Sequence, residues 1–267
     1  MSPEVFVFTD DLIFDALVSS AYLGGAIIRN AFGTNNQQKN IQKSSSADIV
    51  TETDLLVESR VKSLLAELCP DVEIVSEEDR IQKKISNEKV IYLDPVDGTL
   101  NFSHGFPEVS ISLGYWIGNE PVIGVVYNPI RDEFYSGRKG YGAYKNGKPI
   151  NVSTRKQVVD SLLLTGWPYD KSVSVEIGAL MGSVVSKCQE VRLMGSAALA
   201  VCKVAEGIVD GYWENGLYPW DLAGAVSVLI EAGGRYSSFS GDAFDIYSGE
   251  IIATNGIIHN EVMDYIN

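Results

Sequence analysis

Two aspartates three residues apart carry the strongest chemical signal in the chain. Asp94 and Asp97 follow the apolar run Val-Ile-Tyr-Leu, with Pro95 between them and Gly98 after them. Proline and glycine at these positions predict a turn that aims both carboxylates at one point. Magnesium prefers such oxygen ligands, and the N–H groups of Gly98 and Thr99 can face a bound phosphate. A turn that merely ends a strand would have the same sequence, so this segment alone leaves both interpretations open.

Three more acidic segments could meet this turn. Glu77 lies in the run Ser-Glu-Glu-Asp after a short strand pattern, and neighbouring strands would bring it beside Asp94. Without a cation, carboxylates so close together would repel one another. Asp54 and Asp221 each stand at the start of a helical pattern. Each segment also has a simpler interpretation, which is a solvated loop for the acidic run and helix capping for the other two.

Histidine and cysteine are too few for the other common catalytic sites. The only histidines are His104 and His259, which excludes a zinc site built from several histidines. A Ser-His-Asp mechanism would have to depend on one of these two residues. Cys69, Cys188 and Cys202 form no Cys-x-x-Cys pair, so we expect no disulfide framework and a reducing compartment. The chemistry of the chain should therefore depend on carboxylates.

The acidic composition limits the partners. The 267 residues carry a formal net charge of -14, with 45% hydrophobic and 21% charged residues, as in ordinary globular proteins. A basic face for nucleic acid or for anionic lipid is therefore not expected. A phosphorylated small molecule is compatible with this charge, because cations held by clustered carboxylates attract phosphate. We find no signal peptide and no stretch of about 20 apolar residues, so we expect a soluble cytoplasmic protein.

The elements that must position these acids divide the chain into two parts. Residues 1–150 combine two helices with strands, and residues 151–267 alternate strands and helices. We therefore expect an α+β part followed by an α/β part, with the functional site between them. The predicted helices span 11–32, 54–68, 174–187, 195–207, 221–232 and 258–266.

The strand patterns predict where the acids lie. The strands at 73–78 and 89–95 each end on acidic residues, which would place the acids at an edge rather than in the core. Residues 108–145 alternate strands and turns, as in an antiparallel meander. The polar segment 33–47 predicts a mobile loop or a solvated hairpin. A mobile loop would act as a flap that carries Lys43 toward the metals, and the simpler interpretation is an ordinary solvated loop. The remaining predicted strands are 161–166, 191–195, 209–214 and 235–239.

Five motifs, taken together, resemble the inositol monophosphatase family. In order they are Asp-Ile-Val-Thr-Glu-Thr-Asp at 48–54, Glu-Glu at 77–78, Leu-Asp-Pro-Val-Asp-Gly-Thr-Leu-Asn-Phe at 93–102, Gly-Ser-Ala-Ala at 195–198 and Trp-Asp-Leu-Ala-Gly at 220–224. Ser76 departs from the family pattern, which usually has glycine before the Glu pair. The resemblance implies a layered αβαβα sandwich, usually dimeric, with a magnesium-dependent and lithium-sensitive phosphatase activity.

The resemblance also implies roles for individual residues. Asp54 and Thr99 would orient the attacking water, and two or three Mg²⁺ ions would bridge the phosphate without a covalent enzyme intermediate. Glu214 would contact the substrate, although it could also be a surface acid at a strand end. The implied metal ligands are Glu77, Asp94, the Val96 carbonyl, Asp97 and Asp221, and Glu77 also counts among the catalytic residues. The implied substrate contacts are Asp97, Gly98, Thr99, Gly195, Ser196, Ala197, Glu214 and Asp221.

The substrate within the family stays open. The segment 99–107 resembles the inositol monophosphatase branch, so inositol 1-phosphate is the expected substrate. Fructose 1,6-bisphosphate, alone or as a second activity, and 3'(2'),5'-bisphosphate nucleotides are alternatives. A non-enzymatic alternative is a regulatory protein that binds the transcription machinery, but the complete ligand set and the negative charge favour the enzyme. We expect a homodimer with no nucleic-acid or membrane partner.

Overall fold

A seven-stranded sheet forms the first large layer of strands in the computed structural model. Its strands follow the order β3-β4-β5-β6-β7-β8-β9, with β3 parallel to β4 and each later pair antiparallel. The meander predicted for 108–145 is therefore present. The structure describes residues 12–34, 41–42, 49–77, 88–168, 170–242 and 244–267. The strands span β3 (Glu73–Ser76), β4 (Lys89–Asp97), β5 (Ser110–Ile117), β6 (Glu120–Asn128), β7 (Glu133–Arg138), β8 (Gly142–Lys145) and β9 (Lys148–Ile150).

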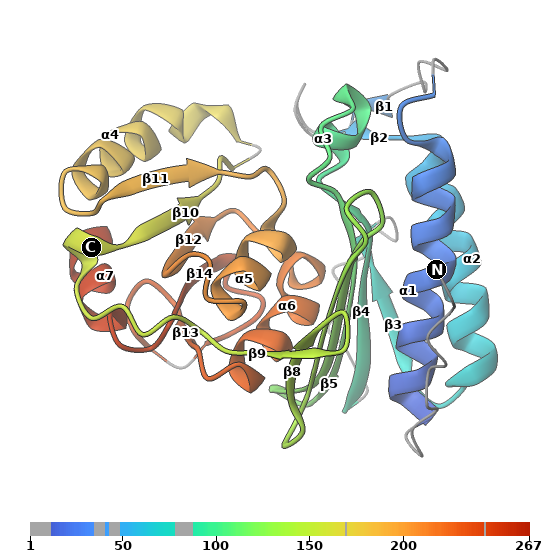
Figure 1. Cartoon of the computed structure of the whole chain (residues 1–267). Helices are drawn as coiled ribbons and strands as arrows, with labels where there is room; N and C mark the ends of the chain where they lie inside the picture. Colours follow the sequence, from blue (N-terminus) through green and yellow to red (C-terminus); the bar gives the residue numbers. More distant parts are fainter. Residues whose placement is uncertain (1–11, 35–40, 43–48, 78–87, 169, 243) are drawn as a thin grey trace.

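Two helices cover one face of this sheet. α1 (Leu12–Ala31) and α2 (Glu52–Leu68) lie side by side and pack on the sheet (Figure 1). Their helical periodicity places apolar side chains on the face that meets the strands. A first core fills the space between helices and sheet, and its fully buried members include Leu17, Ile28, Val57, Val61, Leu65, Leu93 and Ile111.

The helix α1 has the length and the apolar composition of a membrane-spanning segment, which the sequence analysis did not anticipate. Its inner face, with Ala16, Leu17 and Ile28, is buried in the first core. A core helix of a globular protein has the same two properties, so length and composition alone do not assign α1 to a membrane.

The predicted loop before α2 contains a short antiparallel pair. β1 (Ile41–Gln42) pairs antiparallel with β2 (Ile49–Val50), as the hairpin interpretation of this segment expects. Lys43 and most of the segment 33–47 lie outside the described residues, and the predicted flap stays a prediction.

The second sheet has five strands and a mixed topology. Its order is β11-β10-β12-β14-β13, in which β10 runs parallel to β11 and β12, whereas β14 is antiparallel to β12 and β13. α4 (Ser174–Val185) and α7 (His259–Ile266) cover its outer face across a second core (Figure 1). The strands span β10 (Leu162–Thr165), β11 (Glu190–Leu193), β12 (Gly211–Asn215), β13 (Arg235–Ser237) and β14 (Glu250–Thr254).

Two further helices lie between the sheets. α6 (Pro219–Glu231) packs along β5, β6 and β7, and α5 (Ala197–Ala205) contacts α6 and β12 (Figure 1). Together with both sheets they enclose a third core that is rich in alanine and valine. The layers therefore follow the order α1/α2, first sheet, α5/α6, second sheet, α4/α7. This order confirms the predicted αβαβα sandwich.

The structure corrects several details of the predicted elements. The predicted strands leave out β14, and the predicted helices leave out α3 (Thr99–His104). β4 continues through Asp97, because a β-bulge between Asp94 and Asp97 lets it regain its pairing with Ser110. The expectation that the acid ending the strand at 89–95 lies outside the core is wrong, since Asp94 is 2% exposed, and Asp97 after it is 5% exposed.

The division of the chain at residue 150 stays a prediction. The first sheet ends at Ile150 and the second sheet begins at Leu162. However, α5 and α6 belong to the second part of the chain and pack on the first sheet, so one core joins both parts.

Candidate active site

The end of β4 carries the central pair of acids. Asp94 and Asp97 flank the bulge made by Pro95 and Val96, and Asp94 Oδ1 accepts a hydrogen bond from the Val96 N–H at 3.0 Å. Gly98 follows with a φ of 87°, a left-handed conformation that favours glycine, and α3 begins directly after it. The predicted turn at Pro95 is therefore a bulge, and the chain turns at Gly98. Two buried carboxylates and the start of a helix therefore lie within the six residues 94–99.

The neighbouring strand brings Glu77 to the same end of the sheet. β3 runs parallel to β4 with Ser76 opposite Leu93, so Glu77 follows beside Asp94. Burial raises the pKa of Asp94 well above its usual value, and the charge of Glu77 adds to this rise. The register thus puts two carboxylates within electrostatic reach of each other.

A buried pair of side chains links α2 to α3. Asp54 is 0% exposed, and its Oδ2 accepts a hydrogen bond from the Thr51 N–H at 3.1 Å. Its other oxygen, Oδ1, lies 2.9 Å from the Thr99 hydroxyl. That hydroxyl also lies 2.9 Å from the Val96 carbonyl oxygen, and its single proton can serve one acceptor at a time. Thr51 is the N-cap of α2. Asp54 is the third helical residue, which completes the capping box, and is not the cap itself.

Asp97 connects the first sheet to α5. Its Oδ2 accepts hydrogen bonds from Ser110 Oγ at 2.7 Å and from Ser196 Oγ, and its Oδ1 accepts one from the Ala197 N–H at 3.0 Å. Ser196 is the cap of α5. A candidate metal ligand is therefore held by two residues that the sequence analysis assigned to the substrate.

Two glycines let loops from the two halves of the chain touch. A Cβ on Gly98 would lie 2.8 Å from the Glu108 carbonyl oxygen and 3.2 Å from the Gly195 carbonyl oxygen. Asn101 Nδ2 donates to the carbonyl oxygens of Glu108 and Met194, both at 2.8 Å. These contacts fix the loop before α5 beside the start of α3.

Asp221 enters the site from the first turn of α6. The helix begins at Pro219, and Asp221 Oδ2 accepts a hydrogen bond from the Tyr218 N–H at 2.7 Å. Asp221 is therefore the third helical residue, like Asp54 in α2, and the interpretation of Asp221 as the cap itself is wrong. Both acids satisfy an N–H group at a helix start and lie at the edge of the same site.

Glu214 reaches the site from the second sheet. It stands on β12, where its carboxylate accepts a hydrogen bond from the Tyr212 hydroxyl and lies against the Gly166 backbone. Burial raises the pKa of Glu214 to about 7; the Tyr212 hydrogen bond opposes this rise and the charge of Asp97 adds to it. Its link to Asp97 and Asp221 is thus electrostatic.

The assembled carboxylates need a counter-charge. Burial raises the pKa of Asp221 well above its usual value, and the nearby charges of Glu77 and Asp97 increase it. Burial also raises the pKa of Asp97, although its hydrogen bonds oppose the rise. A divalent cation would remove this repulsion, and a donor set made only of oxygen atoms fits Mg²⁺. Within the described residues, however, no three acidic, histidine or cysteine side chains are already arranged around one metal position.

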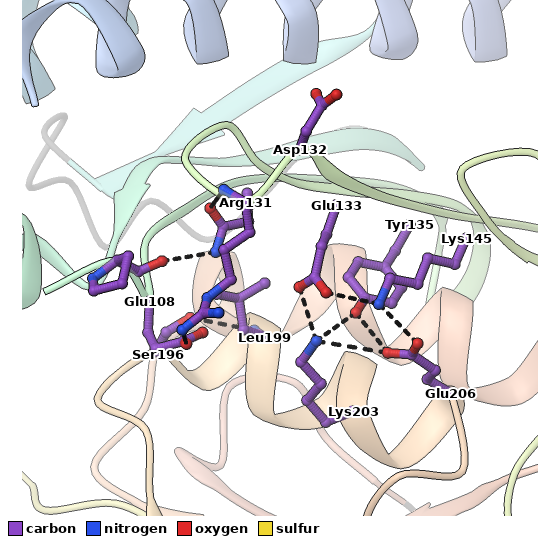
Figure 2. Close-up of polar contacts among 12 residues, drawn as sticks. Glu108, Arg131, Asp132, Glu133, Tyr135, Lys145, Ser196, Leu199, Lys203 and Glu206 are labelled. Carbon is purple, nitrogen blue, oxygen red and sulfur yellow. Dashed lines mark hydrogen bonds and ion pairs between the residues drawn. The ribbon is translucent and has the colours of Figure 1, made fainter.

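A network of charges fixes the far end of α5 (Figure 2). Lys203 Nζ lies 2.8 Å from both Glu133 Oε2 and the Tyr135 hydroxyl, and that hydroxyl donates to Glu206 Oε2 at 2.8 Å. Lys145 Nζ lies 2.7 Å from Glu133 and 2.7 Å from Glu206. We call these five side chains the α5 network. It ties the last turn of α5 to β7 and β8, while the first turn is tied to β4.

The sequence analysis missed several residues that shape this site. Thr51 could have been recognised, because Thr-x-x-Asp before an apolar helical pattern is a capping-box signature. Ser110 had no local signal, since only the register across the bulge places it opposite Asp97. Gly166 meets Glu214 through the pairing of β10 with β12, which no short motif encodes. Tyr212 lies two residues before Glu214 on β12, so the alternation of a strand could have placed both side chains on one face.

The layered αβαβα sandwich brings acids from β4, α2 and α6 to one edge. Such a set of oxygen donors is suited to metal-assisted hydrolysis. Residues 10–267 match the inositol monophosphatase family, and the chain belongs to that family.

Curated and structural relatives agree with this assignment. The chain is 38% identical to the inositol-1-monophosphatase of Synechocystis sp. over 222 residues, which are 83% of this chain and 77% of that protein. The inositol monophosphatase structure from Anabaena (Nostoc) sp. PCC 7120 superposes with a TM-score of 0.84 at 33% identity, covering 95% of this chain and 94% of that one. SaIMPase-II, described with inositol monophosphate bound, has a TM-score of 0.80 at 25% identity and coverages of 95% and 93%.

Proposed function

We propose that this protein hydrolyses inositol 1-phosphate to inositol and inorganic phosphate with Mg²⁺ at the carboxylate site. The observation that carries the proposal is the gathering of Asp94, Asp97 and Asp221 from a strand end and a helix start, with raised pKa values for all three. The similarity to SaIMPase-II, whose structure is described with inositol monophosphate bound, supports the substrate.

Two or three Mg²⁺ ions would be held by oxygen atoms alone. The proposed ligands are the carboxylates of Glu77, Asp94, Asp97 and Asp221 and the carbonyl of Val96. When bound, Mg²⁺ lowers the pKa of a water molecule and neutralises charge on the phosphate. The raised pKa values of the buried acids support cation binding, because a cation restores their preference for the ionised form.

Thr99 and Asp54 are proposed to orient the attacking water. The 2.9 Å hydrogen bond from Thr99 Oγ1 to Asp54 Oδ1 supports this role. When the Thr99 hydroxyl donates its hydrogen bond to Asp54, its lone pairs face outward and can accept a hydrogen bond from the water. The water oxygen then forms the new bond to phosphorus as the bond from phosphorus to the inositol oxygen breaks, and the proton lost by the water ends on the inositol oxygen. The capping bond from Thr51 keeps Asp54 in place during this step.

The substrate hydroxyls are proposed to contact the wall of the site that lies across from Asp54. The residues proposed for this wall come from the loop before α5, from β12, and from the two acids shared with the metal. The hydrogen bonds from Ser110, Ser196 and Ala197 to Asp97 support a rigid wall, because they use three of the four acceptor directions of that carboxylate and leave one for a ligand. The proposed contacts are Asp97, Gly98, Thr99, Gly195, Ser196, Ala197, Glu214 and Asp221.

The experiment is a phosphate-release assay with purified protein and a substrate panel. Inositol 1-phosphate, fructose 1,6-bisphosphate and adenosine 3',5'-bisphosphate are compared at several Mg²⁺ concentrations and in excess chelator. The proposal expects the highest kcat/KM for inositol 1-phosphate and loss of activity in chelator. A higher kcat/KM for fructose 1,6-bisphosphate or for the nucleotide would show that inositol 1-phosphate is not the preferred substrate. Phosphate release that persists in chelator would reject the proposed dependence on Mg²⁺.

Three further measurements test the proposals that come from the family resemblance or from the sequence. A homodimer is expected in light scattering, inhibition is expected in a Li⁺ titration at limiting Mg²⁺, and a cytoplasmic location is expected on fractionation. A monomer, a flat Li⁺ response or a membrane-bound fraction would each reject the corresponding proposal without affecting the reaction.

A further inference from the structure

The Glu214 carboxylate occupies the place where most residues at position 166 would carry a side chain. Thr165 at the end of β10 pairs with Trp213 on β12 in parallel register, so Gly166 comes next to Glu214. A Cβ built on Gly166 would overlap both carboxylate oxygens of Glu214. Glycine at this position therefore lets the carboxylate lie flat against the backbone of the neighbouring strand.

A buried tyrosine holds the same carboxylate from its own strand. Tyr212 and Glu214 are two residues apart on β12, so their side chains lie on the same face of the sheet. The Tyr212 hydroxyl donates a hydrogen bond to Glu214 Oε2. The tyrosine ring is 1% exposed and packs in the core between the two sheets, so it cannot follow the carboxylate if the latter turns away.

These two contacts leave one oxygen of Glu214 for a ligand. Oε2 is engaged by Tyr212, and Oε1 is the oxygen that can accept a hydrogen bond from a bound hydroxyl. The charged groups that face Glu214 are Asp97 across the site and Asp221 on α6. Their negative charge and the burial of Glu214 favour its protonation, whereas the Tyr212 hydroxyl favours the ionised acceptor.

We propose that Tyr212 and Gly166 are positioning residues that hold Glu214 in one orientation and so determine the preference for phosphate esters of polyols. This inference rests on the proposed function, because it assumes that Glu214 accepts hydrogen bonds from substrate hydroxyls. Neither residue touches the substrate. The Tyr212 hydroxyl orients the Glu214 carboxylate and favours its ionised form, and Gly166 provides the space in which that carboxylate lies.

The test compares two substrates that differ in their hydroxyl groups. KM and kcat are measured for inositol 1-phosphate and for p-nitrophenyl phosphate, which has no hydroxyls for Glu214 to bind. Tyr212→Phe should raise KM for inositol 1-phosphate about five- to tenfold, the size of one lost hydrogen bond of ordinary strength. The aryl phosphate should keep both parameters within about twofold. Tyr265→Phe is the matched control, because it removes a similar hydroxyl 2.8 Å from Glu261 on α7.

Two further measurements separate positioning from a general structural effect. The KM for inositol 1-phosphate should rise on acidification, and in Tyr212→Phe this rise should begin at a higher pH, since the ionised form has lost its donor. In a Glu214→Gln background, Tyr212→Phe should have little further effect on KM. Gly166→Ala, which keeps Tyr212, should raise the same KM by pushing the carboxylate aside.

The outcomes distinguish this inference from the proposed function. Wild-type protein that hydrolyses neither substrate would reject the proposed function and this inference with it. Active wild-type protein with an unchanged KM and pH profile in Tyr212→Phe and Gly166→Ala would overturn this inference alone. An equal loss on both substrates in both variants would also overturn it, because it would place Tyr212 and Gly166 among the residues that support the chemistry. Should Tyr212→Phe fail to fold, Gly166→Ala decides the question.

Discussion

At the scale of single residues, the candidate acids serve the fold as well as the site. Asp54 and Asp221 each accept an N–H group at the start of a helix, and Asp97 accepts three hydrogen bonds that join β4, β5 and α5. Removing such a side chain would disturb both stability and activity. Amide replacements, which keep the shape and one of the two acceptor oxygens, are therefore the informative variants.

His259 predicts how the protein responds to acid. It is 0% exposed, with Nε2 2.8 Å from Ser237 Oγ and Nδ1 3.0 Å from Thr254 Oγ1. Burial lowers its pKa from 6.5 to about 4. The neutral ring therefore contributes stability that is complete above pH 6.5 and is lost as the pH falls from 6.5 toward 4, by on the order of 3 kcal/mol.

The measurement is the free energy of unfolding in urea at several pH values between 7 and 4.5. His259→Gln should lose less stability across this range than the wild type, because its side chain does not titrate. His104→Gln is the control, since His104 is exposed and is the only other histidine. The acids of the site titrate in all three proteins and cancel in the comparison. Parallel curves for all three would reject the role of His259.

At the scale of elements, the position of Asp221 depends on how closely α6 approaches the first sheet. Gly114, Gly124 and Gly137 stand side by side on β5, β6 and β7, under the helix. A Cβ on Gly124 would overlap the Gly224 carbonyl oxygen and lie 2.7 Å from Ser227 Cβ. The missing side chains let the backbone of α6 rest on the strands, which sets the height of its first turn above β4.

Gly124→Ala should therefore push α6 away from the sheet. We expect a loss of about 1 to 3 kcal/mol in unfolding free energy, as for other overpacked cores. A shift of the first turn by about 1 Å could lower kcat about 100-fold. Gly182→Ala in α4 is the matched control, because a Cβ there meets nothing within 4 Å and alanine favours a helix. Equal stability and activity in the two variants would contradict this account of the packing.

The elements were predictable where one period dominated the sequence. α1, α2 and α4 to α7 coincide with helical patterns, and the meander of β5 to β8 coincides with alternating strands and turns. β14 was missed, although its Ile-Ile-Ala-Thr run ends at an Asn-Gly turn, because the run is too short to show a period. β4 extends through Asp97 because Asp97 pairs with Ser110 on β5. The sequence instead predicted that the strand ends at Pro95, because proline is rare inside a strand.

At the scale of the whole molecule, polar contacts join the layers in addition to the apolar cores. The α5 network joins the middle helix layer to β7 and β8, and its lysine and glutamate side chains are 13% to 19% exposed. Its two lysines and two glutamates balance in charge (Figure 2). Pairs this well covered are costly to break on one side.

Lys203→Met should leave Glu133 and Glu206 partly uncompensated between two layers. We expect a loss of about 2 to 4 kcal/mol in unfolding free energy, measured in urea. Lys139→Met removes the exposed pair with Glu120, whose side chains are 55% and 59% exposed, and should cost less than about 1 kcal/mol. A cost for Lys203→Met no larger than that of Lys139→Met would show that the network does not join the layers.

The sequence was enough to predict the carboxylates of the site, but not the residues that hold them in place. The carboxylates could be proposed from the sequence because their residue types and order suggest one chemistry, as in Asp94-Pro-Val-Asp97. The contacts that hold them arise from long-range packing. Gly166 against Glu214, Ser110 against Asp97 and the glycines under α6 have no spacing that a linear pattern reveals.

The central claim is that these acids form one magnesium-dependent catalytic centre, and Asp94→Asn tests it most directly. Phosphate release from inositol 1-phosphate is measured against Mg²⁺ concentration for the wild type, for Asp94→Asn and for Asp71→Asn, an exposed acid outside the site. The account predicts a kcat/KM at least about 100-fold lower in Asp94→Asn, because one ligand charge is lost. It also predicts unchanged activity in Asp71→Asn and no loss of thermal stability in metal-free Asp94→Asn, since a repulsive charge has gone. A wild-type rate in Asp94→Asn, or full wild-type activity in excess chelator, would contradict it.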